Sequence, residues 1–205
     1  MNRKTRSMLL ICALVSFLGF WVENIWLAVT KGYMNNRSMY APFLLGYGLA
    51  VLAIYFLLGT PQKMRFLKWK LPVSHPIRRW LAYYGAACLC VMAGEVALGT
   101  FVEKTCGIVW WNYEAIPLHI TRYTSLPTSS LFGILITVFM GCFFSRLYKF
   151  FCAADSRFWD ILAFLLASVM TLDFLGFAWH IGSTRKLRPL WHIAMPWKGP
   201  LFHIK

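Results

Sequence analysis

Five long apolar segments constrain the fold of this chain more than any other feature of its sequence. They cover residues 8–30, 41–59, 80–102, 129–145 and 158–181. Each holds about 17 to 24 mostly apolar residues, the length that a helix needs to cross roughly 30 Å of hydrocarbon. Hydrophobic residues make up 59% of the chain and charged residues only 14%, a balance that soluble domains rarely show. We therefore predict an all-α integral membrane protein with about five transmembrane helices in a single polytopic domain, residues 1–205.

The basic residues fall mainly on one side of the predicted bundle. Twelve lysines and arginines flank the helices on the side of the amino terminus, and four lie in the opposite loops. Because positive loops usually face the cytoplasm, we predict a multi-pass plasma-membrane protein with a cytoplasmic amino terminus and a cytoplasmic 60–79 loop. The aromatic tail, residues 182–205, adds five cations on the other side and is expected to lie on the membrane surface. The net charge of +14 then indicates contact with lipid headgroups and no nucleic-acid partner.

Two stretches that precede apolar segments resemble one another. "NNRSMYAPFLLGYG" and "ITRYTSLPTSSLFG" each contain an arginine, a proline five residues later and a glycine eleven residues later. These positions are Arg37, Pro42 and Gly48 in the first stretch, and Arg122, Pro127 and Gly133 in the second. The match predicts a parallel internal repeat of two helices, in which 8–30 and 41–59 correspond to 80–102 and 129–145.

Three acidic residues lie inside the apolar segments at matching depths. Glu23, Glu95 and Asp173 each lie about fifteen residues into a helix that runs outward, which places their carboxylates roughly 22 Å from the inner side. Ionisable groups in a bilayer normally face a bundle interior or a cavity. One interpretation is a shared substrate or ion site that opens outward, with Arg37 and Arg122 as counter-charges. The alternatives are structural pairs between Glu23 and Arg37 and between Glu95 and Arg122, or side chains that extend to the interface.

Other chemical signatures are few. His180 follows Asp173 by seven residues and shares its helix face, which suits a proton relay or a plain hydrogen bond. Glu103 and Asn112 lie near the outer boundary, where they could join a polar site. The sequence has no phosphate-binding G-x-x-x-x-G-K-[ST] motif and no metal-ligand spacing. We therefore predict no metal and no cofactor.

Residues from about 14 to 145 resemble the Putative ABC-transporter type IV membrane proteins, which are common in Gram-positive bacteria. The resemblance rests on "WVENIWLAVTKGYMNNRSMYAPFLLGYG" and "GEVALGTFVEKTCGIVWWNYEAIPLHITRYTSLPTSSLFG". The matching residues of the first half are Glu23, Asn36, Arg37, Pro42, Tyr47 and Gly48; those of the second are Glu95, Glu103, Trp111 and Tyr113. The chain departs from the family pattern at four positions, namely Ser38, Ala41, Asn112 and Glu114.

The resemblance implies a permease-like transport component, with a separate ATPase subunit that would dock on the basic loop 60–79. Two other classes of function stay open. The carboxylates could act as acid and base in an intramembrane enzyme for a lipid or polyprenyl substrate, or the chain could be a scaffold or sensor whose ion pairs are only structural. The oligomeric state, a homo-oligomer included, stays open as well.

Overall fold

A computed structural model describes residues 1–71, 75–188 and 190–196, and this part of the chain is mostly helical. Four long apolar stretches are candidates to cross a membrane: α1 (Arg3–Lys31), α3 (Pro76–Cys106), the continuous stretch Leu126–Ala153 and α6 (Arg157–Thr184). A fifth apolar helix, α2 (Leu45–Leu58), is shorter. The prediction of a helical multi-pass membrane protein is thereby confirmed, whereas the predicted number of about five transmembrane helices is replaced by four candidate spans and a short helix.

The helix α2 begins later than the sequence predicted. We expected residues 41–59, but α2 starts at Leu45 and has 14 residues, which corresponds to about 21 Å and is short of the hydrocarbon thickness. The residues before it are not helical, because their N–H groups are bonded elsewhere. The N–H of Leu44 donates to the carbonyl of Ser16 in the middle of α1, at 3.0 Å. The chain therefore enters the bundle as an extended segment before it turns into α2.

The fourth predicted helix, 129–145, is longer than expected. It comprises α4 (Leu126–Val138), a π-helical turn η1 (Phe139–Phe144) and α5 (Ser145–Ala153). A π-helical turn widens the hydrogen-bond ladder locally. Within this turn, the Gly141 carbonyl accepts a hydrogen bond of 2.6 Å from the side chain of Gln62. The helix thus continues past the predicted end and contacts the loop that follows α2.

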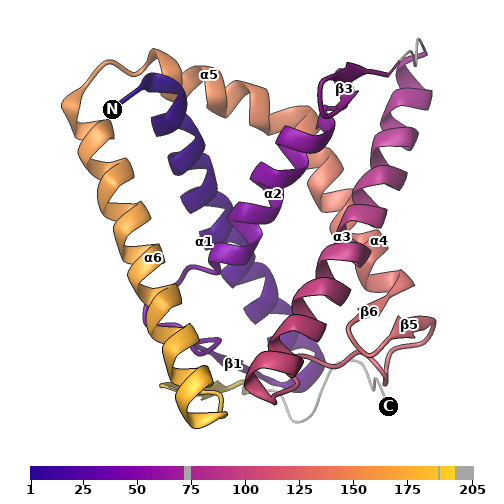
Figure 1. Ribbon diagram of the computed structural model, residues 1–205, viewed down its shortest axis with the longest axis vertical. Coiled ribbons are helices and arrows are strands. Elements are labelled where there is room, and N and C mark those ends of the chain that lie inside the picture. Colours follow the sequence, from indigo (N-terminus) through magenta and orange to yellow (C-terminus); the bar gives the residue numbers. More distant parts are fainter. Residues whose placement is uncertain (72–74, 189, 197–205) are drawn as a thin grey trace.

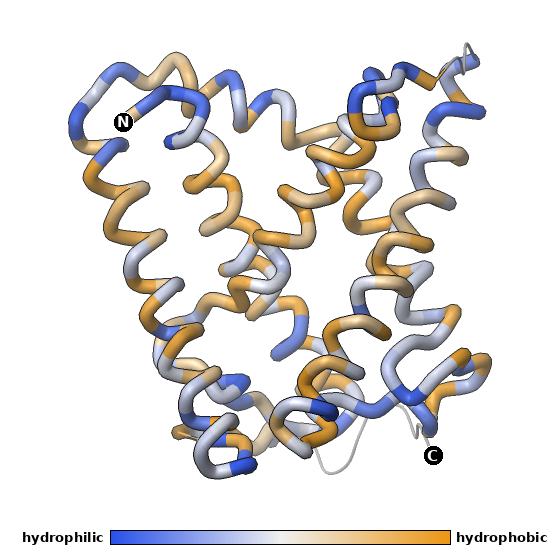
Figure 2. Tube along the Cα trace, viewed as in Figure 1, coloured by the Kyte–Doolittle hydropathy of each residue, from blue (hydrophilic) through white to orange (hydrophobic). Residues whose placement is uncertain are grey.

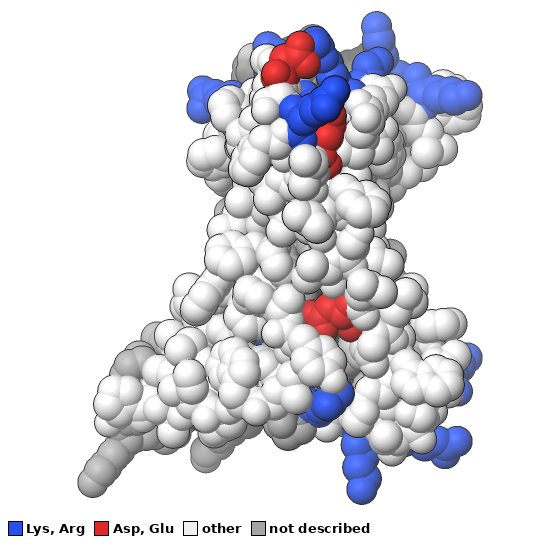
Figure 3. All heavy atoms as spheres, turned by 90° about the vertical axis from the view of Figure 1, so that its left-hand side faces the viewer, with Lys and Arg blue, Asp and Glu red and all other residues white. Residues whose placement is uncertain are grey.

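The helices α1, α2, α3, α4 and α6 alternate in direction between two ends of the molecule, and α5 runs across one of these ends (Figure 1). One end, called the N-side here, holds the amino terminus, the hairpin of β2 (Gly59–Thr60), β3 (Lys63–Phe66) and β4 (Trp69–Lys70), and the α5–α6 connection. The other end, called the far side, holds β1 (Tyr33–Asn35), β5 (His119–Thr121), β6 (Thr124–Ser125) and β7 (His192–Ala194). Apolar residues fill the middle and hydrophilic residues gather at the ends (Figure 2). On the face drawn in Figure 3, the surface between the ends is almost free of charge.

The core lies between α1, α2, α3 and η1. Its fully buried side chains include Ile11, Tyr83, Met140 and Phe144. α1 packs mainly on α2, α5 and α6, and α3 packs mainly on α4. The helices α1 and α3 both end at a glycine with a left-handed backbone, Gly32 and Gly107, a conformation in which glycine meets no steric penalty.

An arginine that the sequence analysis counted only as loop charge fixes the N-side end of α1. Arg6 is 2% exposed. Its guanidinium pairs with Asp160 on α6 at 3.3 Å and donates to the carbonyls of Phe151 and Ala154, where α5 ends. Cations stabilise the carboxyl ends of helices. Arg6 therefore connects α1 with α5 and α6.

The described part of the tail forms a β-strand, β7. β7 pairs antiparallel with β1, with Met34 opposite Ile193. The tail is thereby attached to the segment that follows α1, at the far-side end of the molecule (Figure 1). Residues 189 and 197–205 of the predicted surface segment lie outside the described residues.

Candidate functional site

Glu23, in the far-side third of α1, has a partner on each carboxylate oxygen. Its Oε2 atom lies 2.5 Å from Arg37 Nη2, and its Oε1 atom accepts a hydrogen bond of 2.8 Å from the Tyr47 hydroxyl on α2. Tyr47 reaches Glu23 because its ring packs directly on Gly19, where an added Cβ would collide with it. Glu23 and Arg37 therefore form a neutral pair, as one interpretation of the sequence predicted.

A tight turn after β1 positions Arg37. Asn36 is 1% exposed; its side-chain amide donates to the Met39 carbonyl at 2.9 Å and accepts from the Leu190 N–H at 3.0 Å. Arg37 and Ser38 both have positive φ, 51° and 65°, which non-glycine residues adopt only when the surroundings enforce it. Asn36 thus serves to hold this turn and the tail together.

Glu103 and not Glu95 is the partner of Arg122. Arg122 Nη1 lies 2.8 Å from Glu103 Oε1, and the Tyr123 hydroxyl donates to Glu103 Oε2 at 2.6 Å. Tyr123 packs on Gly99 as Tyr47 packs on Gly19. The expected pair between Glu95 and Arg122 is therefore not found.

Arg122 also approaches a second carboxylate in the loop between α3 and β5. Its Nε atom lies 3.6 Å from Glu114, whose other oxygen accepts from the Asn112 amide at 3.0 Å. The carboxylates of Glu103 and Glu114 raise the pKa of the Arg122 guanidinium above its ordinary value. Trp111 stabilises the same loop, since its indole N–H donates to the Tyr123 carbonyl at 2.9 Å.

Glu95, on α3, has a different environment. Its Oε2 atom accepts hydrogen bonds from the hydroxyls of Thr124, at 2.7 Å, and Ser129, at 3.2 Å. These two hydroxyls are 2.9 Å apart and almost fully buried, at 1% and 0% exposure. Within the described residues, no lysine, arginine or histidine lies within ion-pair distance of Glu95. The carboxyl group is thus surrounded by neutral hydroxyls.

Tyr113 connects Glu95 with Glu23. Its pKa is raised, first by burial and then by the nearby carboxylates of Glu95 and Glu23, while Arg37 opposes the shift. The phenol therefore lies within electrostatic range of both acids. The backbone holds it there, because the Tyr113 N–H donates to the Arg122 carbonyl at 2.8 Å.

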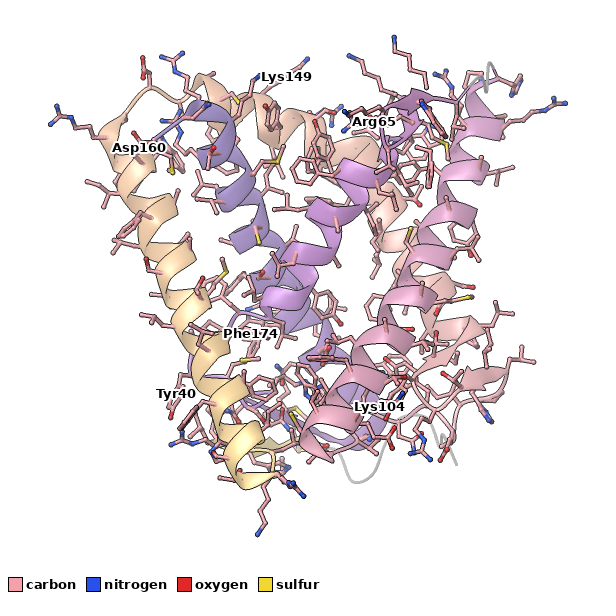
Figure 4. The ribbon with its side chains drawn as sticks, viewed as in Figure 1. Tyr40, Arg65, Lys104, Lys149, Asp160 and Phe174 are labelled. Carbon is pink, nitrogen blue, oxygen red and sulfur yellow. The ribbon has the colours of Figure 1, made fainter. Side chains whose placement is uncertain are left out.

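Asp173, the third acid of the predicted site, binds backbone and no cation. Its two carboxylate oxygens accept hydrogen bonds from the N–H groups of Tyr40, at 2.8 Å, and Ala41, at 2.9 Å. Asp173 is 8% exposed. These bonds provide acceptors for two backbone N–H groups in the extended segment before α2, which are not part of a helix. Tyr40 and Phe174, the neighbours of this contact, are labelled in Figure 4. His180 lies two turns further along α6, with its ring 3.3 Å from the Thr184 hydroxyl.

Two of the three acids that the sequence placed at equal depth, Glu23 and Glu95, lie within electrostatic range of Tyr113, whereas Asp173 binds the backbone before α2. Glu103 forms a separate pair with Arg122. Sequence analysis missed Thr124, Ser129 and Tyr123 as partners, although each lies within the stretch that it had singled out around Arg122. No group of three or more metal-ligand side chains is close enough to hold a metal in the described ranges.

The fold and this cluster define a multi-pass α-helical membrane protein with a polar site near one end of its bundle. A family model with the description Putative ABC-transporter type IV matches residues 10–177, and the chain belongs to this family. The match extends beyond the 14–145 of the initial resemblance and includes most of α6. No curated protein and no solved structure matches the chain.

Proposed function

We propose that the chain is a permease-like component of a transport system, with a polar site centred on Glu95 that takes a cation or a protonated amine. The supporting observation is that Glu95 has hydroxyl partners and, among residues 1–71, 75–188 and 190–196, no positive one. A carboxyl group at this depth is costly unless it is protonated or paired. A cationic substrate or a transported proton would supply the missing partner.

The contacts around the two arginines support the proposal of a two-helix repeat, α1–α2 and α3–α4. In each half a glutamate follows a glycine by four residues, a tyrosine ring covers that glycine and donates to the glutamate, and an arginine pairs with the same glutamate. The sets are Gly19, Glu23, Arg37 and Tyr47, then Gly99, Glu103, Arg122 and Tyr123. The tyrosines come from different places, since Tyr47 lies on α2 and Tyr123 between β5 and β6, and the glycines align α1 with α3 differently from the arginines. When α1 and α3 are aligned on the two glycines, Glu95 corresponds to Val15, and we propose that Glu95 is an addition to the repeated scaffold.

We further propose that the N-side is cytoplasmic, on the basis of its twelve lysines and arginines. The polar site then faces outward. The family description suggests an ATP-driven system, and the sequence contains no phosphate-binding loop of its own. A separate ATPase subunit would therefore dock on the N-side, with the 60–79 loop as the proposed surface.

Transport measurements in cells test this proposal. A strain without the gene would be complemented with the wild type, Glu95→Gln or Asp155→Asn and supplied with labelled metal cations, amines and amino acids. Asp155 is an exposed carboxylate at the other end of the bundle and serves as the control. We expect Glu95→Gln to abolish the gene-dependent flux at an unchanged membrane level of the protein, and Asp155→Asn to retain it.

Two results would count against the proposal. Flux through Glu95→Gln equal to that of the wild type would remove Glu95 from the site. If the wild type changed the level of no labelled compound, the transport role itself would fail. Flux that persists after ATP depletion, in a protein that never copurifies with an ATPase, would remove only the ATP-driven form.

A further inference from the structure

The hairpin β2–β3–β4 on the N-side is a fixed element and not a loose loop. The N–H of Leu67, at its turn, donates to the Leu57 carbonyl near the end of α2, at 2.7 Å. The Tyr83 hydroxyl on α3 donates to the Gly59 carbonyl at 3.0 Å, and Met64 is buried in the main core. Contacts with two helices and the core therefore set the orientation of the hairpin.

A hollow of about 480 Å³ lies between this hairpin and α2. Its wall is formed by Phe56, Arg65, Leu67, Lys68 and Trp69. The apolar members are well exposed, with 57% for Phe56 and 76% for Trp69. Phe56 belongs to the apolar helix α2, whereas Arg65, on β3, lies near the N-side end of that helix (Figure 4). The hollow thus has an apolar wall that continues onto the apolar helix α2, and two cations at the polar boundary.

The cations of this hollow have no acidic partner among the residues that the structure describes. Residues 24–94 contain no aspartate and no glutamate, and the N-side acids Asp155 and Asp160 pair with Arg3 and Arg6. Arg65 is held by the Tyr55 carbonyl at 3.3 Å and by its ring. Its Nε atom is buried and has no hydrogen-bond partner within the described residues. No acid in the described part of the chain neutralises the guanidinium charge.

We propose that this hollow binds one anionic phospholipid. Its phosphate would lie between Arg65 and Lys68, since guanidinium and ammonium groups both recognise phosphate. Trp69 would lie at the headgroup level, where tryptophan is enriched, and an acyl chain would run along Phe56. A lipid fits better than a soluble phosphate because the wall is apolar, and an anionic headgroup fits better than a zwitterionic one because the surrounding cations are unpaired.

Native mass spectrometry of the purified protein tests the proposal, with phosphatidylglycerol or phosphatidylcholine added to the detergent. The wild type should retain one phosphatidylglycerol in preference to phosphatidylcholine. The double variant Arg65→Gln/Lys68→Gln should bind it about thirtyfold more weakly, because each of the two cations contributes about 1 kcal/mol. The control Arg146→Gln/Lys149→Gln removes two exposed cations from α5 on the same side and should bind as the wild type does. Lys68→Glu alone, at an exposed side chain, gives the same readout if the double variant is poorly folded.

Three outcomes would overturn the proposal. Equal weakening in the control variant would show diffuse surface charge in place of a site. Competition by glycerol phosphate or inorganic phosphate at similar concentration would show a site for soluble anions. Unchanged lipid retention in Lys68→Glu, together with loss of a copurifying ATPase, would show that the hollow is a protein-docking surface.

Discussion

Replacement of Asp173 should destabilise the protein more than replacement of any other acid. Asp173→Ala removes both acceptors from the N–H groups of Tyr40 and Ala41 at a position that is only 8% exposed. A hydrogen bond to a charged group contributes about 1.5–3 kcal/mol, so the two together contribute about 3–6 kcal/mol. Asp173→Asn keeps one acceptor oxygen and should lose about half of that free energy of unfolding.

Two measurements check this prediction. Denaturant unfolding of the purified protein in micelles gives the loss of stability, and hydrogen exchange of residues 40–44 shows whether the extended segment opens first. The matched control is Asp155→Ala, whose ion pair with Arg3 is exposed and should matter by less than about 1 kcal/mol. If Asp173→Ala costs no more than this control, or if exchange at 40–44 is unchanged, the capping argument is wrong.

Three further predictions concern the same region. Glu23→Gln and Arg37→Ala should each lower the stability by about 1–3 kcal/mol, and a double-mutant cycle should show that the combined loss is smaller than the sum; strict additivity would contradict a direct pair. Gly19→Ala should destabilise by about 1–3 kcal/mol because its Cβ meets a tyrosine ring, whereas Gly46→Ala, with open space around it, should stabilise α2 by about 0.5–1 kcal/mol; thermal unfolding of both variants decides the signs. The pKa of Tyr113 is raised by burial and nearby carboxylates. The contribution of the neutral phenol to stability is therefore present below the unfolded pKa of about 10 and is lost as the pH rises above it. Tyr113→Phe should flatten the fall of the melting temperature above pH 10, and an unchanged slope would argue against the shift.

Hydropathy predicted the class of fold because crossing a bilayer places one strong demand on composition. It did not predict where α2 begins. That position depends on Asp173, which lies 132 residues after Ala41 and holds its N–H, and a local pattern contains no such information. The same limit explains why the partner of Arg122 was assigned incorrectly. Glu95 and Glu103 differ by two helical turns, and the choice between them depends on Tyr123 and Gly99, which fix the loop in space.

Equal depth in the membrane therefore does not imply an equal role for the three acids, because each has a different partner. Glu23 is neutralised by an arginine, and Asp173 accepts hydrogen bonds from two backbone N–H groups. Both partners are parts of the scaffold, so both acids are accounted for by the fold itself. In the described part of the chain, the partners of Glu95 are the hydroxyls of Thr124 and Ser129, which can adapt to a protonated acid, a carboxylate or a carboxylate with a bound cation. That adaptability is what a transport site needs and a structural pair does not, which is why the proposed site is centred on Glu95.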